Sequence, residues 1–261
     1  MKPEELAEYA EREWIGPVSA YIRNLLGKVH LPSHDFDHHF RVWKNLRTII
    51  AIHACGKGSP GEGFISQALL SAFFHDTGMI TDRGPAHGQD SRMFLEEFLL
   101  KRGLDPEAYA QALEAVEKHD DKTYSGEISL LTDILGMADD VDAFGRIGAV
   151  RYAEIYTCRG GDPYKASEWV IPNLESRFRH LEACFPAGHP WIAEQEKRYT
   201  VTMDLFSSGM VFLPVVRLVD EVVNRRKSGY MELCEMAAAR RLPLPVREFF
   251  RDFEAELMVQ N

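Results

Sequence analysis

The stretch LSAFFHDTGM, residues 70–79, constrains the fold more than any other part of this chain. Its apolar run predicts the last turns of a buried helix, and Gly78 marks where that helix ends. An imidazole and a carboxylate, His75 and Asp76, stand together at the buried end. Two ionisable groups in such a place cost free energy unless they are paired, hydrogen-bonded or bound to a cation. The chain is therefore expected to bring partners for this pair into its core.

Nearly every other segment repeats apolar residues at a spacing of three to four, which is typical of amphipathic helices. No segment shows the alternation of a convincing strand, so the sequence predicts an all-α fold of about ten or more helices. Residues 3–26 are expected to form one or two helices, broken near Gly16-Pro17. Because no change in composition marks a boundary, we expect a helical core over residues 1–160. Residues 161–261 are expected to be a helical extension packed on that core, not an independent domain.

Composition and charge exclude several classes of protein. With 45% hydrophobic and 27% charged residues, the chain is globular rather than disordered. Its formal net charge of −10 argues against non-specific binding to nucleic acid or to anionic membranes. The longest apolar run, residues 209–219, contains Pro214 and Arg217 and is far shorter than the ~20 residues of a membrane span. We therefore expect no membrane partner and no role in nucleic-acid binding.

The cysteines and the first residues indicate a compartment. Four cysteines lie far apart without a CxxC pair, and we interpret them as reduced thiols: Cys55, Cys158, Cys184 and Cys234. The chain begins with MKPEELAEYAEREW, which is acidic and amphipathic and so unlike a secretory signal. Both features predict a cytoplasmic protein.

Three further residues lie on or beside helices that can converge on the His-Asp pair: His38, His87 and Asp139. Imidazole nitrogens and carboxylate oxygens suit a divalent cation such as Mn²⁺, Fe²⁺, Ni²⁺, Co²⁺, Zn²⁺ or Mg²⁺. Two imidazoles and two carboxylates leave coordination positions open for water and substrate. A cation held in this way can generate hydroxide near neutral pH and polarise a phosphoryl oxygen.

Three runs, HHFRVW, ALLSAFFHDTG and ADDVDAFGRIGAVR, carry a resemblance. Together they are similar to the HD superfamily of metal-dependent phosphohydrolases, over roughly residues 34–156. The resemblance implies an all-α HD-domain bundle that takes a divalent metal ion. It also implies the metal ligands His38, His75, Asp76 and Asp139, and a second role for Asp76 in holding or activating the attacking water.

Two departures from the family pattern bear on the substrate. Many members carry a lysine three residues after the Asp of the doublet, where this chain has Met79. The usual Asp-Ala-Asp-Arg run reads Met-Ala-Asp-Asp at residues 137–140, so a carboxylate is lost and an arginine is replaced. The cations that can take over phosphate binding are Arg41, which we group with Asp76 as catalytic, and Arg83, Lys122 and Arg146.

Two more histidines leave the number of metal ions open. Some HD subgroups bind two metals, and their second site is completed by extra histidines. These histidines stand at about the same place in the chain as His87 and His119. By contrast, His34, four residues before His38, is interpreted as a loop residue, with a role beside the metal or substrate as the minor alternative. The remaining histidines have no supporting context and are assigned to the surface or the core: His30, His39, His53, His180 and His189.

Three functions follow from the resemblance. The first is a phosphohydrolase that cleaves a phosphomonoester or phosphodiester of a small molecule, with nucleotides among the candidates. The second is a diiron oxygenase on the same scaffold, which needs His87 and His119 as ligands. The third is a catalytically idle ligand-binding module, supported only by Met79 in place of the lysine. For the C-terminal helices, covering the site, binding a partner and forming a homodimer interface all stay open.

Overall fold

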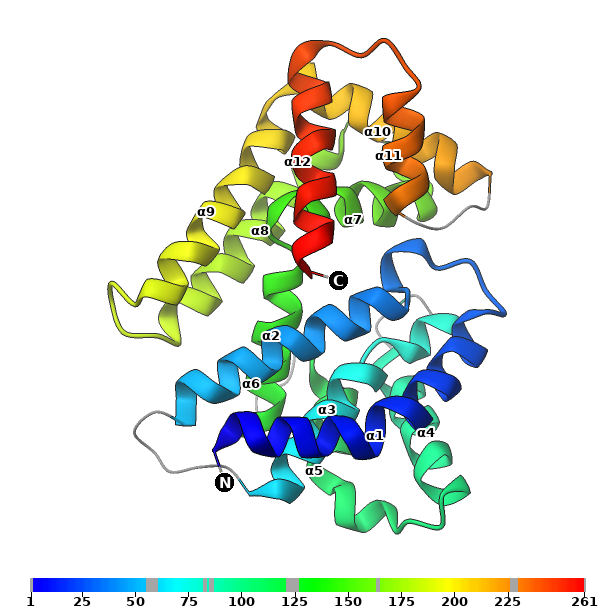
Figure 1. Cartoon of the computed structure of the whole chain (residues 1–261), viewed down its shortest axis with the longest axis vertical. Helices are drawn as coiled ribbons and strands as arrows, with labels where there is room; N and C mark the ends of the chain where they lie inside the picture. Colours follow the sequence, from blue (N-terminus) through cyan, green and yellow to red (C-terminus); the bar gives the residue numbers. More distant parts are fainter. Residues whose placement is uncertain are drawn as a thin grey trace. The chain divides into compact units, whose positions relative to one another are not determined.

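The computed structural model describes residues 2–54, 61–81, 84, 87–120, 127–162, 165–225 and 230–260. Every regular element in these ranges is a helix, from α1 to α12 with three short 3-10 turns (Figure 1). The predicted all-α fold is confirmed. The chain divides into two compact units, Met1–Asp139 and Asp140–Asn261. The predicted division near residue 160 stays a prediction.

The first unit is built around a buried helix, α3 (Glu62–Phe74). Its residues from Ala68 to Phe74 are all buried, and α1, α2 and α5 pack against it. Because α3 has no solvent-facing side in its last turns, the residues that follow it, His75 and Asp76, also lie in the interior. The other elements of this unit are α1 (Pro3–Leu26), η1 (Pro32–His34), α2 (Phe36–Ala54), η2 (Thr77–Ile80), α4 (His87–Lys101), η3 (Pro106–Tyr109), α5 (Ala110–Lys118) and most of α6 (Leu130–Asp142).

The expected break near Gly16-Pro17 is wrong, because α1 continues through Pro17 without interruption. A proline inside a helix costs about 3 kcal/mol, since its ring removes a backbone hydrogen bond and crowds the preceding turn. Three residues of α1 at four-residue spacing, Trp14, Val18 and Ile22, are buried. Each such side chain contributes about 1.5–3 kcal/mol when it leaves water, so their burial outweighs the cost of the proline.

The second unit packs its helices around α7 (Gly145–Cys158), which is contacted by α9, α10 and α12. A buried ion pair lies at its edge, where Arg151 donates to Asp142 at 2.8 Å. The remaining helices are α8 (Ala166–Ala183), α9 (Pro190–Ser207), α10 (Gly209–Asn224), α11 (Tyr230–Ala238) and α12 (Leu244–Gln260).

The N-terminus of α7 is capped from the C-terminal helix. The Glu256 carboxylate accepts the Arg146 backbone N–H at 2.9 Å, and Arg198 donates to the Phe144 carbonyl at 2.9 Å. Burial raises the pKa of Glu256, although Arg198 opposes that rise. Gly145 begins the helix with a φ of 85°, in the left-handed region that glycine tolerates best. A Cβ added there would lie 2.3 Å from Glu256 Oε1, so the cap leaves no room for a side chain.

We expect Gly145→Ala to lower the free energy of unfolding by roughly 2–4 kcal/mol, because it combines strain at positive φ with displacement of the Glu256 cap. Gly188→Ala is the matched control, since Gly188 has a φ of 75° but no atom within 4 Å of the added Cβ. It should cost about 1 kcal/mol. Urea unfolding of both variants separates the two effects, and equal losses would rule out a role for the cap.

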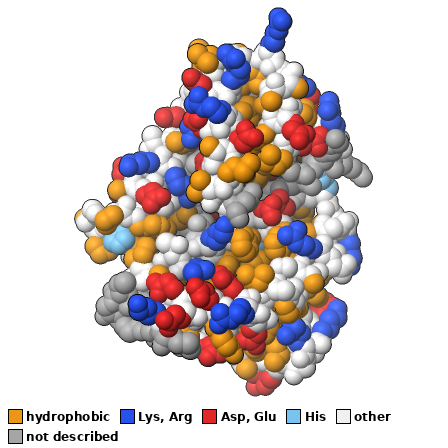
Figure 2. Space-filling view, viewed as in Figure 1, with side chains coloured by type: hydrophobic (Ala, Val, Ile, Leu, Met, Phe, Trp, Pro, Cys, Tyr) orange, Lys and Arg blue, Asp and Glu red, His pale blue; other side chains and the backbone are white. Residues whose placement is uncertain are grey.

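Within the described part of the chain, no single helix is long and apolar enough to cross a membrane. Helices α9 and α10 meet the requirement of length and composition only as a pair, and that pair is bent by 89°. On the face shown in Figure 2, acidic and basic side chains are interspersed among hydrophobic and neutral ones.

Candidate metal centre

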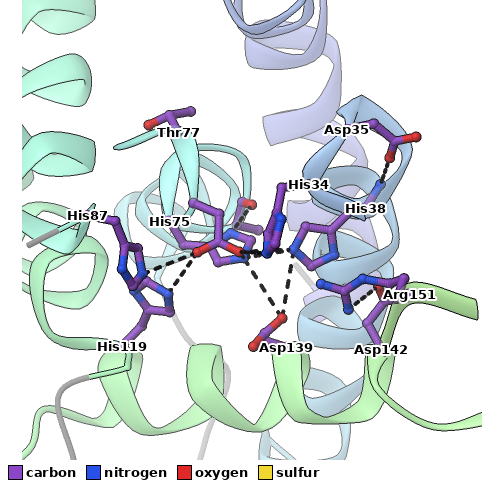
Figure 3. Close-up of polar contacts among 12 residues, drawn as sticks. His34, Asp35, His38, His75, Thr77, His87, His119, Asp139, Asp142 and Arg151 are labelled. Carbon is purple, nitrogen blue, oxygen red and sulfur yellow. Dashed lines mark hydrogen bonds and ion pairs between the residues drawn. The ribbon is translucent and has the colours of Figure 1, made fainter. Parts of the chain in front are cut away.

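The Asp76 carboxylate is the point on which the histidines of the first unit converge. The His75 backbone N–H continues the α3 hydrogen-bond pattern by donating to the Ser71 carbonyl at 3.0 Å, and Asp76 directly precedes η2. His75 is fully buried and Asp76 is 5% exposed. Figure 3 shows His34 and His38 on one side of His75 and His87 and His119 on the other. Helix α3 therefore places His75 and Asp76 at the centre of the group of histidines.

The first group of potential metal ligands contains His38, His75, Asp76 and Asp139, whose donor atoms all lie within 4.8 Å of one another. His38 Nε2 lies 3.1 Å from His75 Nε2 and 3.3 Å from Asp76 Oδ2. Asp139 Oδ1 lies 3.7 Å from His38 Nε2 and 4.0 Å from His75 Nε2. Ligand atoms bonded to one ion at about 2.0–2.2 Å lie roughly 3 to 4.4 Å apart, so this group fits a divalent cation.

A second group consists of Asp76, His87 and His119, and its donor atoms also lie within 4.8 Å of one another. His87 Nε2 is 3.4 Å from Asp76 Oδ1, and His119 Nε2 is 3.3 Å from the same oxygen. The first group faces the other oxygen, Oδ2. Asp76 thus offers one oxygen to each group, as a carboxylate that bridges two ions does.

Backbone carbonyls fix the orientation of three of these imidazoles. Each ring places Nδ1 at hydrogen-bond distance from the carbonyl of the residue three positions earlier, at 2.9 Å for His75, 2.8 Å for His87 and 3.0 Å for His119. Because a carbonyl can only accept, Nδ1 carries the proton and Nε2 of the neutral ring keeps its lone pair. Such contacts are characteristic of metal-binding histidines, whose tautomer is set by the partner of the other nitrogen.

Local structure also positions the ligands on α2 and α6. The Asp35 side chain caps α2 by accepting the His38 backbone N–H at 2.9 Å. Further along α2, Asn45 donates to the Ala138 carbonyl at 3.1 Å, directly before Asp139. These two hydrogen bonds fix the start of α2 and join it to the turn of α6 that carries the carboxylate.

The pKa of Asp76 and the pKa values of its neighbouring histidines depend on one another. Burial alone would raise the pKa of Asp76, but the neighbouring imidazoles, His75 first, hold it well below its ordinary value. Burial alone would lower the pKa of His75 and of His87, and the Asp76 carboxylate reverses both shifts. The pKa of His87 rises to about 9. In the metal-free protein the carboxylate is therefore ionised, and His87 holds a proton that an ion would have to displace.

Two histidines near the centre stood outside the predicted ligand set. His34, interpreted as a loop residue, lies in η1 with its Nε2 3.6 Å from Asp76 Oδ2. Its position four residues before His38 was the only signal. His39 is a core residue, as the alternatives for it allowed, and burial lowers its pKa well below the ordinary value. Its ring packs 5.4 Å from that of His38 and 5.1 Å from that of His75.

Two of the four cations expected to bind phosphate, Arg41 and Arg146, lie in the described part of the chain. Arg41 is buried on α2. Burial raises the pKa of Asp35, and the charge of Arg41 opposes that rise. Arg146 belongs to the second unit and donates to Asp252 at 2.8 Å. Arg83 and Lys122 lie outside the described residues. A phosphate-binding role for these four cations stays a prediction.

Comparison with known proteins agrees with the geometry. Residues 35–143 match the HD domain family, so this segment of the chain is an HD domain. The HD domain defines an all-α superfamily of metal-dependent phosphohydrolases. Every residue of both ligand groups lies inside the matched segment. Comparison with curated proteins and with solved structures gave no match.

The raised pKa of His87 predicts how the stability of the metal-free protein depends on pH. A histidine whose pKa is raised on folding stabilises the folded state fully below pH 6.5, and this contribution is lost as pH rises through about 9. We expect the free energy of unfolding of chelator-treated protein to fall across this interval, and His87→Gln to flatten the fall. Urea unfolding at several pH values measures it, with His53→Gln as the control. An unchanged slope in His87→Gln would contradict the assignment.

Proposed function

We propose that this protein is a metal-dependent phosphohydrolase that cleaves a phosphomonoester or phosphodiester of a small molecule, with nucleotides among the candidate substrates. The observation that supports the proposal most is the Asp76 carboxylate, which serves two groups of metal ligands inside an HD domain. His38, His75, Asp76 and Asp139 would hold the first ion, and Asp76, His87 and His119 the second.

The charge of such a centre favours an anionic substrate. The two carboxylates, Asp76 and Asp139, contribute −2, and neutral imidazoles contribute nothing. One divalent ion brings the sum to zero, and two bring it to +2. In a buried site a net positive charge attracts a phosphoryl group strongly, because the low local dielectric screens the attraction less than water does. Filling of both positions would therefore offset the absence of a lysine at Met79.

Metal ions at these positions would supply a water that ionises near neutral pH and would polarise a phosphoryl oxygen. The chain contributes the rest. Its buried imidazoles keep the ligand atoms converged, since the Nδ1 contacts fix three of the rings. The ionised Asp76 accepts hydrogen bonds, so it can also orient the attacking water. Burial of the ligands limits access of bulk water to the centre.

We expect purified protein to contain stoichiometric divalent metal and to hydrolyse at least some members of a panel of phosphomonoesters and phosphodiesters. His75→Ala and Asp76→Asn should lose metal and reduce kcat/KM by about 100-fold or more. His53→Ala, on α2 but outside both ligand groups, is the control and should keep both properties. Metal content by mass spectrometry and steady-state kinetics test this; metal-free protein, or unchanged hydrolysis in both ligand variants, would refute the proposal.

A second candidate function, a diiron oxygenase, is favoured by one observation. It needs two metal positions that share a carboxylate, and the group of Asp76, His87 and His119 could hold the second ion. The two functions differ in their consumption of oxygen. We expect the iron-loaded protein to show no substrate-dependent oxygen uptake while it hydrolyses phosphoesters. Oxygen uptake that depends on iron and is abolished in His87→Ala would replace the hydrolase with the oxygenase.

A further inference from the structure

The two histidines of the second group come from elements that supply no ligand of the first group. His87 is the first residue of α4, and His119 directly follows the end of α5. Helix α4 packs against η2 and α5, and α5 also packs against α3. Two close backbone contacts within this arrangement hold α4 and α5 at the distance from Asp76 at which both Nε2 atoms lie near Oδ1.

The first contact is between the backbones of η2 and α4, at Gly78. A Cβ added to Gly78 would lie 2.0 Å from the His87 carbonyl oxygen and 2.7 Å from the Ser91 backbone nitrogen. The Gly78 N–H donates to the fully buried Ser91 hydroxyl at 2.7 Å. Gly78 lies two residues after Asp76 in the chain. The contact therefore fixes the His87 backbone directly against the segment that carries the shared carboxylate.

The second contact is between the backbones of α4 and α5, at Gly88. A Cβ added to Gly88 would lie 2.3 Å from the Glu117 carbonyl oxygen and 3.1 Å from its carbonyl carbon. Gly88 follows His87, and Glu117 lies two residues before His119. This contact sets the separation of the two imidazoles, whose rings are 5.3 Å apart.

Both obstructions are backbone atoms, so no change of side-chain rotamer relieves them. Carbon and oxygen atoms in ordinary contact lie more than 3 Å apart, and a methyl group at either position would push α4 away by about 1 Å. Metal–nitrogen bonds tolerate deviations of only about 0.2 Å. A displacement of this size is therefore incompatible with ligation by His87, while His38 and Asp139 lie on α2 and α6, which take part in neither contact.

We infer that Gly78 and Gly88, with Ser91, are positioning residues for the second metal ion, and that they set its affinity independently of the first. The inference rests on the proposed two-metal centre. Gly78 in HDTG and Gly88 in AHG thereby have a role in metal binding. Ending one helix and beginning another would not by itself require a glycine at either position. Loss of the close approach at either glycine converts a two-ion centre into a one-ion centre.

The experiment is a titration of metal-free, full-length protein with Mn²⁺ by equilibrium dialysis, with bound ions counted by mass spectrometry. Electron paramagnetic resonance distinguishes isolated from coupled Mn²⁺. The variants are Gly88→Ala and the milder Ser91→Ala, which removes the acceptor of the Gly78 N–H without adding volume. Gly63→Ala is the matched control, because Gly63 lies in α3 with no atom within 4 Å of the added Cβ.

We expect wild type and Gly63→Ala to bind two ions and Gly88→Ala to bind one, with the signal of isolated Mn²⁺. Ser91→Ala should weaken the second ion roughly 10-fold and leave the first unchanged. Retention of the first ion shows that the variants are folded. Wild-type affinity for the second ion in both variants, or equal loss of both ions in Ser91→Ala, would overturn the inference. Wild type that binds one ion and hydrolyses phosphoesters would overturn it too, yet leave the hydrolase intact.

Discussion

The first unit depends on one buried anion. Placing the Asp76 carboxylate in the interior costs several kcal/mol unless partners compensate it. Imidazoles supply this compensation: His34, His38 and His75 lie near one oxygen and His87 and His119 near the other. The helices and turns that carry these histidines are therefore held together by their contacts with Asp76. Loss of the carboxylate would lower the stability of the unit, since the imidazoles would then lack their anion.

The helical fold and the first group of ligands could be predicted from the sequence, because they depend on patterns of residues that are close together in the chain. The apolar run before His75 predicted the buried helix that leads to His75 and Asp76, and the three-to-four spacing of the other segments predicted that the chain is helical. The family resemblance then supplied Asp139, which its acidic surroundings alone would not have distinguished. The structure brings all four residues of this set together.

The features that escaped prediction depend on tertiary packing. Pro17 signals a break, and only the buried face of α1 overrides it. His34 gave a signal through its spacing from His38, but nothing in its own segment shows that it approaches Asp76. The departure at Asp140 is of the same kind. In place of the family's arginine, its carboxylate accepts a hydrogen bond from Arg177 at 2.6 Å, a residue 37 positions later. Such partners are distant in sequence, so no local pattern predicts them.

The wide spacing of the first-group ligands along the chain links metal binding to folding. The first-group ligands stand at positions 38, 75, 76 and 139, so they span most of the first unit. An ion bound to them would act as a cross-link that the unfolded chain cannot keep, and its binding energy would add to the folding energy. The supply of metal would then set the abundance of the protein as well as its activity, because chains without metal unfold and are degraded more often.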